Sequence, residues 1–351
     1  MDLARNFMNT FKSALVIAAV CVSVAASAAP GAGRVWPREP GTVRIRLVST
    51  LPADKAAPGQ EPSFFIKAFR LIIGIKADQR RGPGFVRPMG IVARGRLVYA
   101  ADPGAGGVII YDEQKRSFRV IPANSRKRLP SPVGVAVASD GGVYVSDSRL
   151  RVVLRFEALG RGDGELKPPP GAFLRPGGLA LDERRGRLWV ADAAAHLVHA
   201  YDLRGEYVFS IGGRGEGPGR FNFPTYLSVD ERTGTLWVCD SGNFRLQSFD
   251  AGGKPLKSIG SGGDRPGYLA RPRGVALDSE GHLYVADGLL STVQIFDEEE
   301  RFLLYFGERG GEPGEFYLPG GVFIDAADRI YVADTYNARV QVFQYLKGGQ
   351  P

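Results

Sequence analysis

The sequence predicts an all-β fold, a six-bladed β-propeller of four-stranded antiparallel blades, closed by an N-terminal strand and carrying one short N-terminal helix. The first observation behind this prediction is an apolar segment ending in aspartate that recurs six times. The second is the spacing of these aspartates, which is 45, 45, 48, 47 and 47 residues and indicates a radial or stacked repeat. The repeated aspartates are Asp102, Asp147, Asp192, Asp240, Asp287 and Asp334.

Residues 1–28 have the pattern of an export signal. Arg5 and Lys12 precede an apolar run, and the small residues Ala26-Ser27-Ala28 follow it as at a cleavage site. We therefore expect an exported protein that is periplasmic or extracellular. Two alternatives would associate it with a membrane: the segment could be an uncleaved anchor, or Cys21 could carry a lipid. Cleavage would leave Cys239 as the last cysteine, which excludes an internal disulfide and favours a small buried residue.

Residues 29–41 are predicted to be a linker, and residues 42–51 a strand without a repeat of its own. The sixth repeat ends with its third strand, so we expect residues 42–51 to supply the outer strand of the last blade and remove an open edge. Residues 52–80 are a second linker with a short helix, starting near Ser63 and stopping at Gly74. The apolar side chains of residues 63–75 would plug the propeller or contact a partner or membrane surface.

Residues 81–346 contain the six repeats, and residues 347–351 form a tail. Each repeat has four short β-rich runs separated by turn residues, as a propeller blade requires. The first run starts at proline and alternates large and small residues, so that neighbouring blades can approach closely near the axis. Tyr226 stands where the other five repeats have glycine.

The repeats resemble those of the NHL-repeat β-propeller family over residues 81–346. The match is closest in repeats four and six, which carry the Asp-x-x-Asn-x-Arg signature as Asp240, Asn243 and Arg245 and as Asp334, Asn337 and Arg339. The resemblance implies that these residues hold the blade turn by hydrogen bonds and an ion pair. Repeats one, two, three and five keep only the aspartate, so we expect softer or differently packed loops there, where ligand contacts could sit. The family covers RNA-binding domains, extracellular sensor domains and a peptide-amidating lyase, so the resemblance implies a fold and not a function.

No metal site or cofactor is expected. His196 and His199 lie three residues apart at a strand, which sends their side chains to opposite faces, and His282 falls at the other end of its blade. The six aspartates could ring a cation, but bonding to turn backbone explains them better. The glycine-rich segments before the first strands lack a following Gly-Lys-Ser/Thr, which excludes a phosphate-binding loop.

One end of the propeller is a candidate binding face. Arginines precede or follow the first prolines of several repeats, at the end that carries the aspartate loops; with Tyr226, the predicted face comprises Arg87, Arg175, Arg271 and Arg273. Such a face suits a protein, an anionic glycan or a lipid headgroup, and the formal net charge of +8 agrees with it. Nucleic acid fits the charge but not an exported protein. We expect a monomeric, non-catalytic binding or scaffold protein; the alternative is a propeller enzyme of lyase or lactonase type with a metal near the channel.

Overall fold

The computed structural model describes residues 33–37, 42, 44–52, 84–122, 128–158 and 164–348. The predicted signal and the predicted helix around residues 63–74 lie outside the described residues. Within them the elements are strands, apart from two 3-10 turns, η2 (Ser241–Asn243) and η3 (Thr335–Asn337). No helix of the described part is long and apolar enough to cross a membrane.

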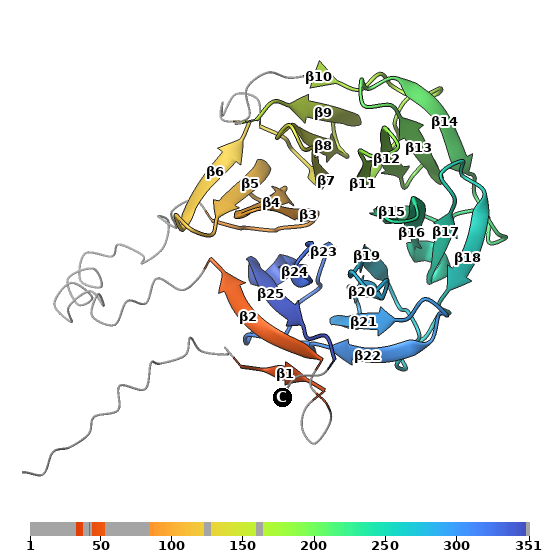
Figure 1. Cartoon of the computed structure of the whole chain (residues 1–351). Helices are drawn as coiled ribbons and strands as arrows, with labels where there is room; N and C mark the ends of the chain where they lie inside the picture. The colour runs from red at the N-terminus through yellow and green to blue at the C-terminus, as the bar shows by residue number, and fades with distance from the viewer. Residues whose placement is uncertain are drawn as a thin grey trace, which may run out of the picture.

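Six antiparallel sheets stand around a central axis, which confirms the predicted six-bladed propeller (Figure 1). In each sheet the first strand lies next to the axis and later strands lie progressively further out. Blade one consists of β3 (Ile91–Arg94), β4 (Leu97–Asp102), β5 (Gly107–Asp112) and β6 (Ser117–Ile121). Blade two consists of β7 (Pro132–Val137), β8 (Val143–Asp147), β9 (Val152–Phe156) and β10 (Gly164–Glu165). Blade three consists of β11 (Pro176–Asp182), β12 (Arg187–Asp192), β13 (Leu197–Tyr201) and β14 (Tyr207–Gly212). Blade four consists of β15 (Pro224–Asp230), β16 (Thr235–Asp240), β17 (Arg245–Phe249) and β18 (Pro255–Ile259). Blade five consists of β19 (Pro272–Leu277), β20 (Leu283–Asp287), β21 (Thr292–Phe296) and β22 (Phe302–Phe306).

The sixth blade joins the two ends of the described chain. It contains β23 (Val322–Ile324), β24 (Arg329–Asp334) and β25 (Arg339–Tyr345), and β2 (Ile45–Leu51) pairs antiparallel with β25. β1 (Val35–Trp36) adds a fifth strand outside β2, which the sequence analysis did not anticipate because two residues carry no periodicity. β2 begins later than expected, and its alternation of buried and exposed residues stops after Val48, where the register of its pairing with β25 shifts between Leu47 and Ser49.

Hydrophobic cores fill the spaces between neighbouring blades. Each of the six core clusters combines residues of two adjacent blades, so no blade buries its faces alone. Alternation along the strands supplies one apolar layer to each side. The cluster between blades four and five includes Cys239, which is fully buried as expected from its place among Ala and Ser. The cluster between blades five and six includes Trp36 of β1, which packs on Phe306 and Phe343.

Near the axis the blades approach one another backbone to backbone. A Cβ built on Gly90 would lie 2.5 Å from the carbonyl oxygen of Val133, and the amide of Gly90 donates to that same oxygen. A Cβ on Gly321 would meet the carbonyl oxygen of Met89 at 2.8 Å. Glycine at this position of the first strand therefore permits the close approach that a six-bladed ring needs, as the alternation of large and small residues predicted.

Candidate functional site

The two ends of the propeller have different chemistry. We call the end with the loops that follow the six repeated aspartates the Asp-loop end, and the end with the turns between first and second strands the hairpin end. The segments that lead into the first strands also reach the Asp-loop end, because Pro176 pairs with Asp192 and Pro272 pairs with Asp287 across each blade. The predicted binding face belongs to the Asp-loop end.

The six repeated aspartates are fully buried and bind backbone amides. Asp102, for example, accepts hydrogen bonds from the amides of Val86 at 2.7 Å and Arg87 at 2.9 Å. Asp147, Asp192, Asp240, Asp287 and Asp334 accept equivalent bonds from the segment before their own first strand. Each carboxylate thus fixes the residues that form the surface of the Asp-loop end, and the six are not gathered as an open ring around the channel.

Blades four and six add side-chain donors to this arrangement. The Oδ2 atom of Asp240 accepts from Asn243 at 2.8 Å, Arg245 at 2.9 Å and Gln247 at 3.1 Å. In blade six, Asp334 accepts from Asn337 at 2.9 Å, Arg339 at 2.6 Å and Gln341 at 3.0 Å. These Asn, Arg and Gln side chains also donate to carbonyl oxygens of the glycine-rich lead-ins, so each cluster ties a loop to its blade.

The other four loops keep the same backbone although they lack the Asn and Arg. One residue of each loop is left-handed in all six repeats, with φ between 53° and 72°: Gly106, Arg151, His196, Phe244, Ser291 and Ala338. In the four repeats without Asn, amides of the loop itself donate to the aspartate, as Ala105 does to Asp102. The loops therefore differ in their hydrogen-bond donors more than in their shape.

The predicted arginines lie where the aspartates hold the backbone. The amides of Arg87, Arg175 and Arg271 donate to repeated aspartates, and all three side chains are exposed. None of the three forms an ion pair within the described residues. Arg87 instead covers the ring of Tyr336, 5.4 Å from its centroid. Arg273 is partly buried, with its side chain beside Gly288.

Tyr226 is not a surface member of this face. Only 8% of it is exposed, and it belongs to the core cluster between blades four and five. Its hydroxyl is buried without a hydrogen-bond partner in the described part of the chain. Burial raises the pKa of Tyr226 to about 12. The structure thus separates Tyr226 from the arginines with which the sequence analysis grouped it, since its side chain turns inward from the strand.

Nine exposed apolar side chains lie in the segments of the Asp-loop end, and we call this set the apolar ring; the sequence analysis missed it. Every blade contributes to this apolar ring, which consists of Val86, Leu150, Leu174, Phe223, Phe244, Tyr268, Leu289, Tyr317 and Tyr336. Tyr317 and Tyr336 lie 5.4 Å apart, centroid to centroid, and Arg309 covers Tyr317. On blades three and four, Phe223 packs against His196 at 4.8 Å. All of them lie within five residues before a first strand or after a repeated aspartate, so their positions could have been noticed in the sequence.

The hairpin end carries polar links between blades instead. Arg94 of blade one donates to the carbonyl of Val137 in blade two, and Ser139 of blade two donates to Glu183 in blade three. Every further pair of neighbours has such a link: Arg184 to the carbonyl of Glu231, Arg232 to Glu298, Ser279 to Asp328, and Arg329 to Glu113. The charged side chains at this end hold the ring together.

The three histidines occupy separate positions. His199 is buried, stands where blades four, five and six have glutamine, and shares a hydrogen bond of 2.7 Å with Ser210. His282 lies at the hairpin end, where its Nδ1 atom bonds to Asp278 at 2.8 Å. That hydrogen bond raises the pKa of His282, although burial opposes the change. Among the described residues, no three His, Cys, Asp or Glu side chains are grouped so that they could hold a metal ion.

Comparison with solved structures finds several proteins of similar fold. The chain is similar to an auxiliary nutrient binding protein from Bacteroides thetaiotaomicron VPI-5482 (12% identity, TM-score 0.59, covering 75% of this chain and 70% of that one). It is also similar to a gluconolactonase from Xanthomonas campestris (17%, TM-score 0.57, 75% and 87%). A third similar structure is virginiamycin B lyase from Staphylococcus aureus (13%, TM-score 0.53, 74% and 96%). At these identities the likeness concerns the fold alone.

Family models agree with the resemblance noted in the sequence. A model described as a 6-bladed beta-propeller matches residues 180–260, and the NHL repeat model matches residues 269–296 and 316–343. A search of curated proteins found no significant match. The matched repeats and the six sheets lead to one conclusion: the chain is a six-bladed β-propeller that contains NHL repeats at residues 269–296 and 316–343.

Proposed function

We propose that this chain is an exported, non-catalytic binding or scaffold protein whose Asp-loop end holds a partner protein with acidic side chains. The observation that carries the proposal is the apolar ring together with Arg87, Arg175 and Arg271, which are exposed and form no ion pair in the described chain. Aromatic residues and arginine are the side chains most enriched at protein interfaces and at their energetic hot spots. An exposed apolar patch bordered by charge is a typical interaction surface.

A protein partner fits this end better than a small anion does. A bound anion needs several donors that converge in a sheltered site, whereas these arginines belong to different blades and are exposed. The apolar ring extends over all six blades and offers most to a partner with a broad surface. Acidic side chains on that partner would complement the arginines and would increase the association rate at low salt.

Binding of the partner tests this proposal directly. Purified wild-type protein is immobilised, and proteins retained from the extracytoplasmic fraction are identified and then measured individually for affinity. Replacement of both Arg175 and Arg271 by alanine should lower the affinity for the partner at least tenfold and reduce the salt dependence of binding. Replacement of Lys115 and Arg204, exposed in turns at the hairpin end, is the matched control and should change nothing. Equal binding by both double variants would refute the assignment of the face.

The non-catalytic part of the proposal has an independent test. The six repeated carboxylates are bonded to backbone amides, which leaves them poorly placed to act as acids, bases or metal ligands. The alternative is an enzyme of lyase or lactonase type, an activity found among structures of similar fold. Elemental analysis of the purified protein should show no stoichiometric metal, and EDTA should leave partner binding unchanged. A stoichiometric zinc or calcium whose removal abolishes an activity would favour the enzyme.

Export and membrane contact form a further part of the proposal. We expect the mature protein to begin after Ala28, which N-terminal sequencing of the secreted or periplasmic protein would show. If residues 63–75 hold the protein at a membrane, a variant lacking them should move to the soluble fraction and keep its melting temperature. Recovery of the wild-type protein in the soluble fraction would refute the membrane contact.

We also infer that β2 closes the propeller ring. Ile45, Leu47 and Leu51 are almost fully buried, and β2 pairs with β25 along its length. Leu47→Asp would place a charge in the core between blades five and six and should lower stability by several kcal/mol, at the upper end of core substitutions. Val48→Asp is the matched control, because Val48 is 47% exposed on the same strand. Similar unfolding midpoints for both variants would contradict the closure.

A further inference from the structure

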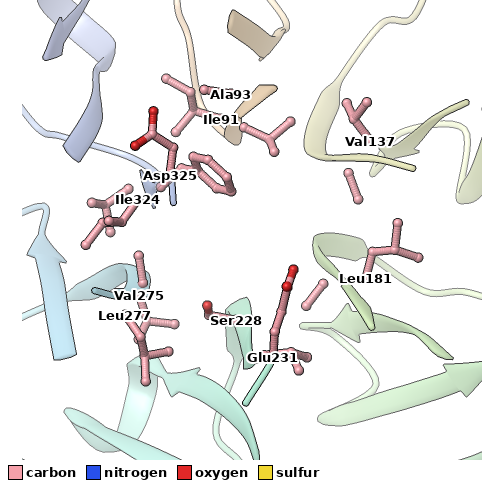
Figure 2. A pocket seen from close by; sticks show the side chains of 18 of the residues that line it. Ile91, Ala93, Val137, Leu181, Ser228, Glu231, Val275, Leu277, Ile324 and Asp325 are labelled. Atoms are coloured by element: carbon pink, nitrogen blue, oxygen red, sulfur yellow. The ribbon is translucent and has the colours of Figure 1, made fainter. Parts of the chain in front are cut away.

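A cavity of about 820 Å³ lies on the axis of the propeller, away from the Asp-loop end. First strands of all six blades line it, and Figure 2 shows their side chains arranged around an open centre. Residues of the hairpin turns form its rim, among them Gly95, Glu183 and Ala327. The cavity therefore opens at the hairpin end and is separate from the apolar ring.

The lining of the cavity ends before the Asp-loop end. Its innermost lining residues include Gly90, Gly134 and Tyr226, whereas Val133, one position nearer to the Asp-loop end, does not line it. Val133 belongs to blade two, yet it packs against the core cluster of blades four and five that contains Tyr226. Because Tyr226 is the member of that cluster at the innermost glycine position, we take its side chain to span the axis toward Val133. In this orientation, the tyrosine in place of glycine narrows the channel toward the Asp-loop end.

The wall of this pocket is apolar. The labelled side chains that line it include Ile91, Val137, Leu181, Leu277 and Ile324 (Figure 2). Leu181, Leu277 and Ile324 remain partly exposed, which is costly for aliphatic side chains that water alone would contact. A small apolar molecule would cover them, as in most ligand pockets.

The charges at the rim are largely neutralised. Arg94 lies 3.7 Å from Glu183, and the Nε atom of Arg329 bonds to Asp325 at 2.8 Å. The carboxylate of Glu231 has no bond within the described chain and is exposed at the rim. No unpaired cation of the described rim is available for an anionic ligand, so the pocket favours a molecule without charge.

We propose that the axial pocket, entered from the hairpin end, binds an uncharged apolar small molecule. The apolar side chains of its wall and the paired charges of its described rim both favour such a ligand. This site does not depend on the proposed function of the Asp-loop end.

An environment-sensitive dye tests the pocket on the whole protein. The probe is 6-propionyl-2-dimethylaminonaphthalene, which is uncharged, apolar and carries a ketone oxygen. Wild-type protein should bind it saturably at one site, with a blue shift of its emission. Leu181→Asp places a carboxylate in the apolar wall, and Ser228→Trp fills the cavity without adding charge. Each substitution should lower the affinity for the dye at least tenfold. Val208→Asp, on the exposed outer strand of the same blade as Leu181, is the matched control.

A second dye examines whether the pocket requires a carbonyl oxygen. N-phenyl-1-naphthylamine, which is uncharged and apolar but has no carbonyl oxygen, should bind the wild type saturably and respond to the variants in the same way. Circular dichroism of every variant establishes that it is folded, and Ser228 is partly exposed, so its replacement preserves a testable protein if Leu181→Asp does not fold. Absence of saturable binding to the wild type, or equal binding by folded Ser228→Trp, would overturn the proposal.

Discussion

The Asp-loop end and the hairpin end of this propeller use charged residues in opposite ways. At the hairpin end, arginines and carboxylates pair with groups on neighbouring blades, as Arg329 does with Glu113 and Arg232 with Glu298. At the Asp-loop end, buried carboxylates bond within their own blade, while Arg175 and Arg271 remain exposed and have no ion pair in the described chain. The hairpin end stabilises the ring, and the Asp-loop end holds a stable surface from which side chains can bind a partner.

The difference also separates two kinds of side chain within the Asp-loop end itself. Asp102 is fully buried, whereas the side chains that follow the amides it binds, Val86 and Arg87, are exposed. Backbone anchored by a buried carboxylate loses little further conformational entropy when a partner binds, so its exposed side chains are partly preorganised. Stability and binding should therefore respond to different residues that are only a few positions apart.

The largest effect is expected from Asp240→Ala. The substitution removes the acceptor of Asn243, Arg245 and Gln247 and leaves the partly buried guanidinium of Arg245 without its carboxylate. Loss of one partner of a buried ion pair costs about 3–5 kcal/mol, which urea unfolding would measure. Asp264→Ala, at an exposed position of the same end, should change the free energy of unfolding by less than about 0.5 kcal/mol. Equal effects would show that the repeated aspartate is not an anchor.

Tyr336→Ala should separate binding from stability. Tyr336 is 50% exposed and contacts Tyr317 and Arg87, so its loss removes the centre of an aromatic cluster without opening the core. If this cluster is a hot spot, the partner should bind about 2 kcal/mol more weakly, roughly a 30-fold change, in a titration. Tyr305→Ala, on an exposed outer strand, is the control. A large loss of stability in Tyr336→Ala would end the distinction between anchor and surface.

The sequence predicted the fold well and the site only in part, for a physical reason. Aspartate spacing and strand alternation report packing that every repeat must share, so the six blades can be counted from the sequence alone. The outward side of a loop is not constrained in this way: Leu174 and Tyr317 look like core residues in the sequence but are exposed. The prediction for Tyr226 erred in the opposite direction: it placed the side chain on the surface, whereas the side chain is buried. A large residue at a glycine position does not indicate whether its side chain points outward or into the core.

Glu183→Ala tests whether the hairpin end stabilises the fold and does not bind the partner. Glu183 accepts two hydrogen bonds from Ser139 of the neighbouring blade, at 2.7 and 2.8 Å, and also lies near Arg94. Its removal should cost about 1–2 kcal/mol in the free energy of unfolding and leave partner affinity unchanged. Glu206→Ala breaks an ion pair with Lys167 in which both side chains are at least half exposed, so it should have little effect. Weaker partner binding in Glu183→Ala would place the interface at the wrong end.

The smallest effect concerns the pH dependence of stability. Its hydrogen bond with buried Asp278 raises the pKa of His282 above 6.5, so protonated His282 favours the folded state. This contribution is fully present below about pH 6.5, the pKa of an unperturbed histidine, and disappears as the pH rises through the folded-state pKa. The melting temperature of the wild type should thus exceed that of His282→Gln by more at pH 5.5 than at pH 8.5. A difference between wild type and His282→Gln that is the same at both pH values would contradict the favourable pairing of His282 with Asp278.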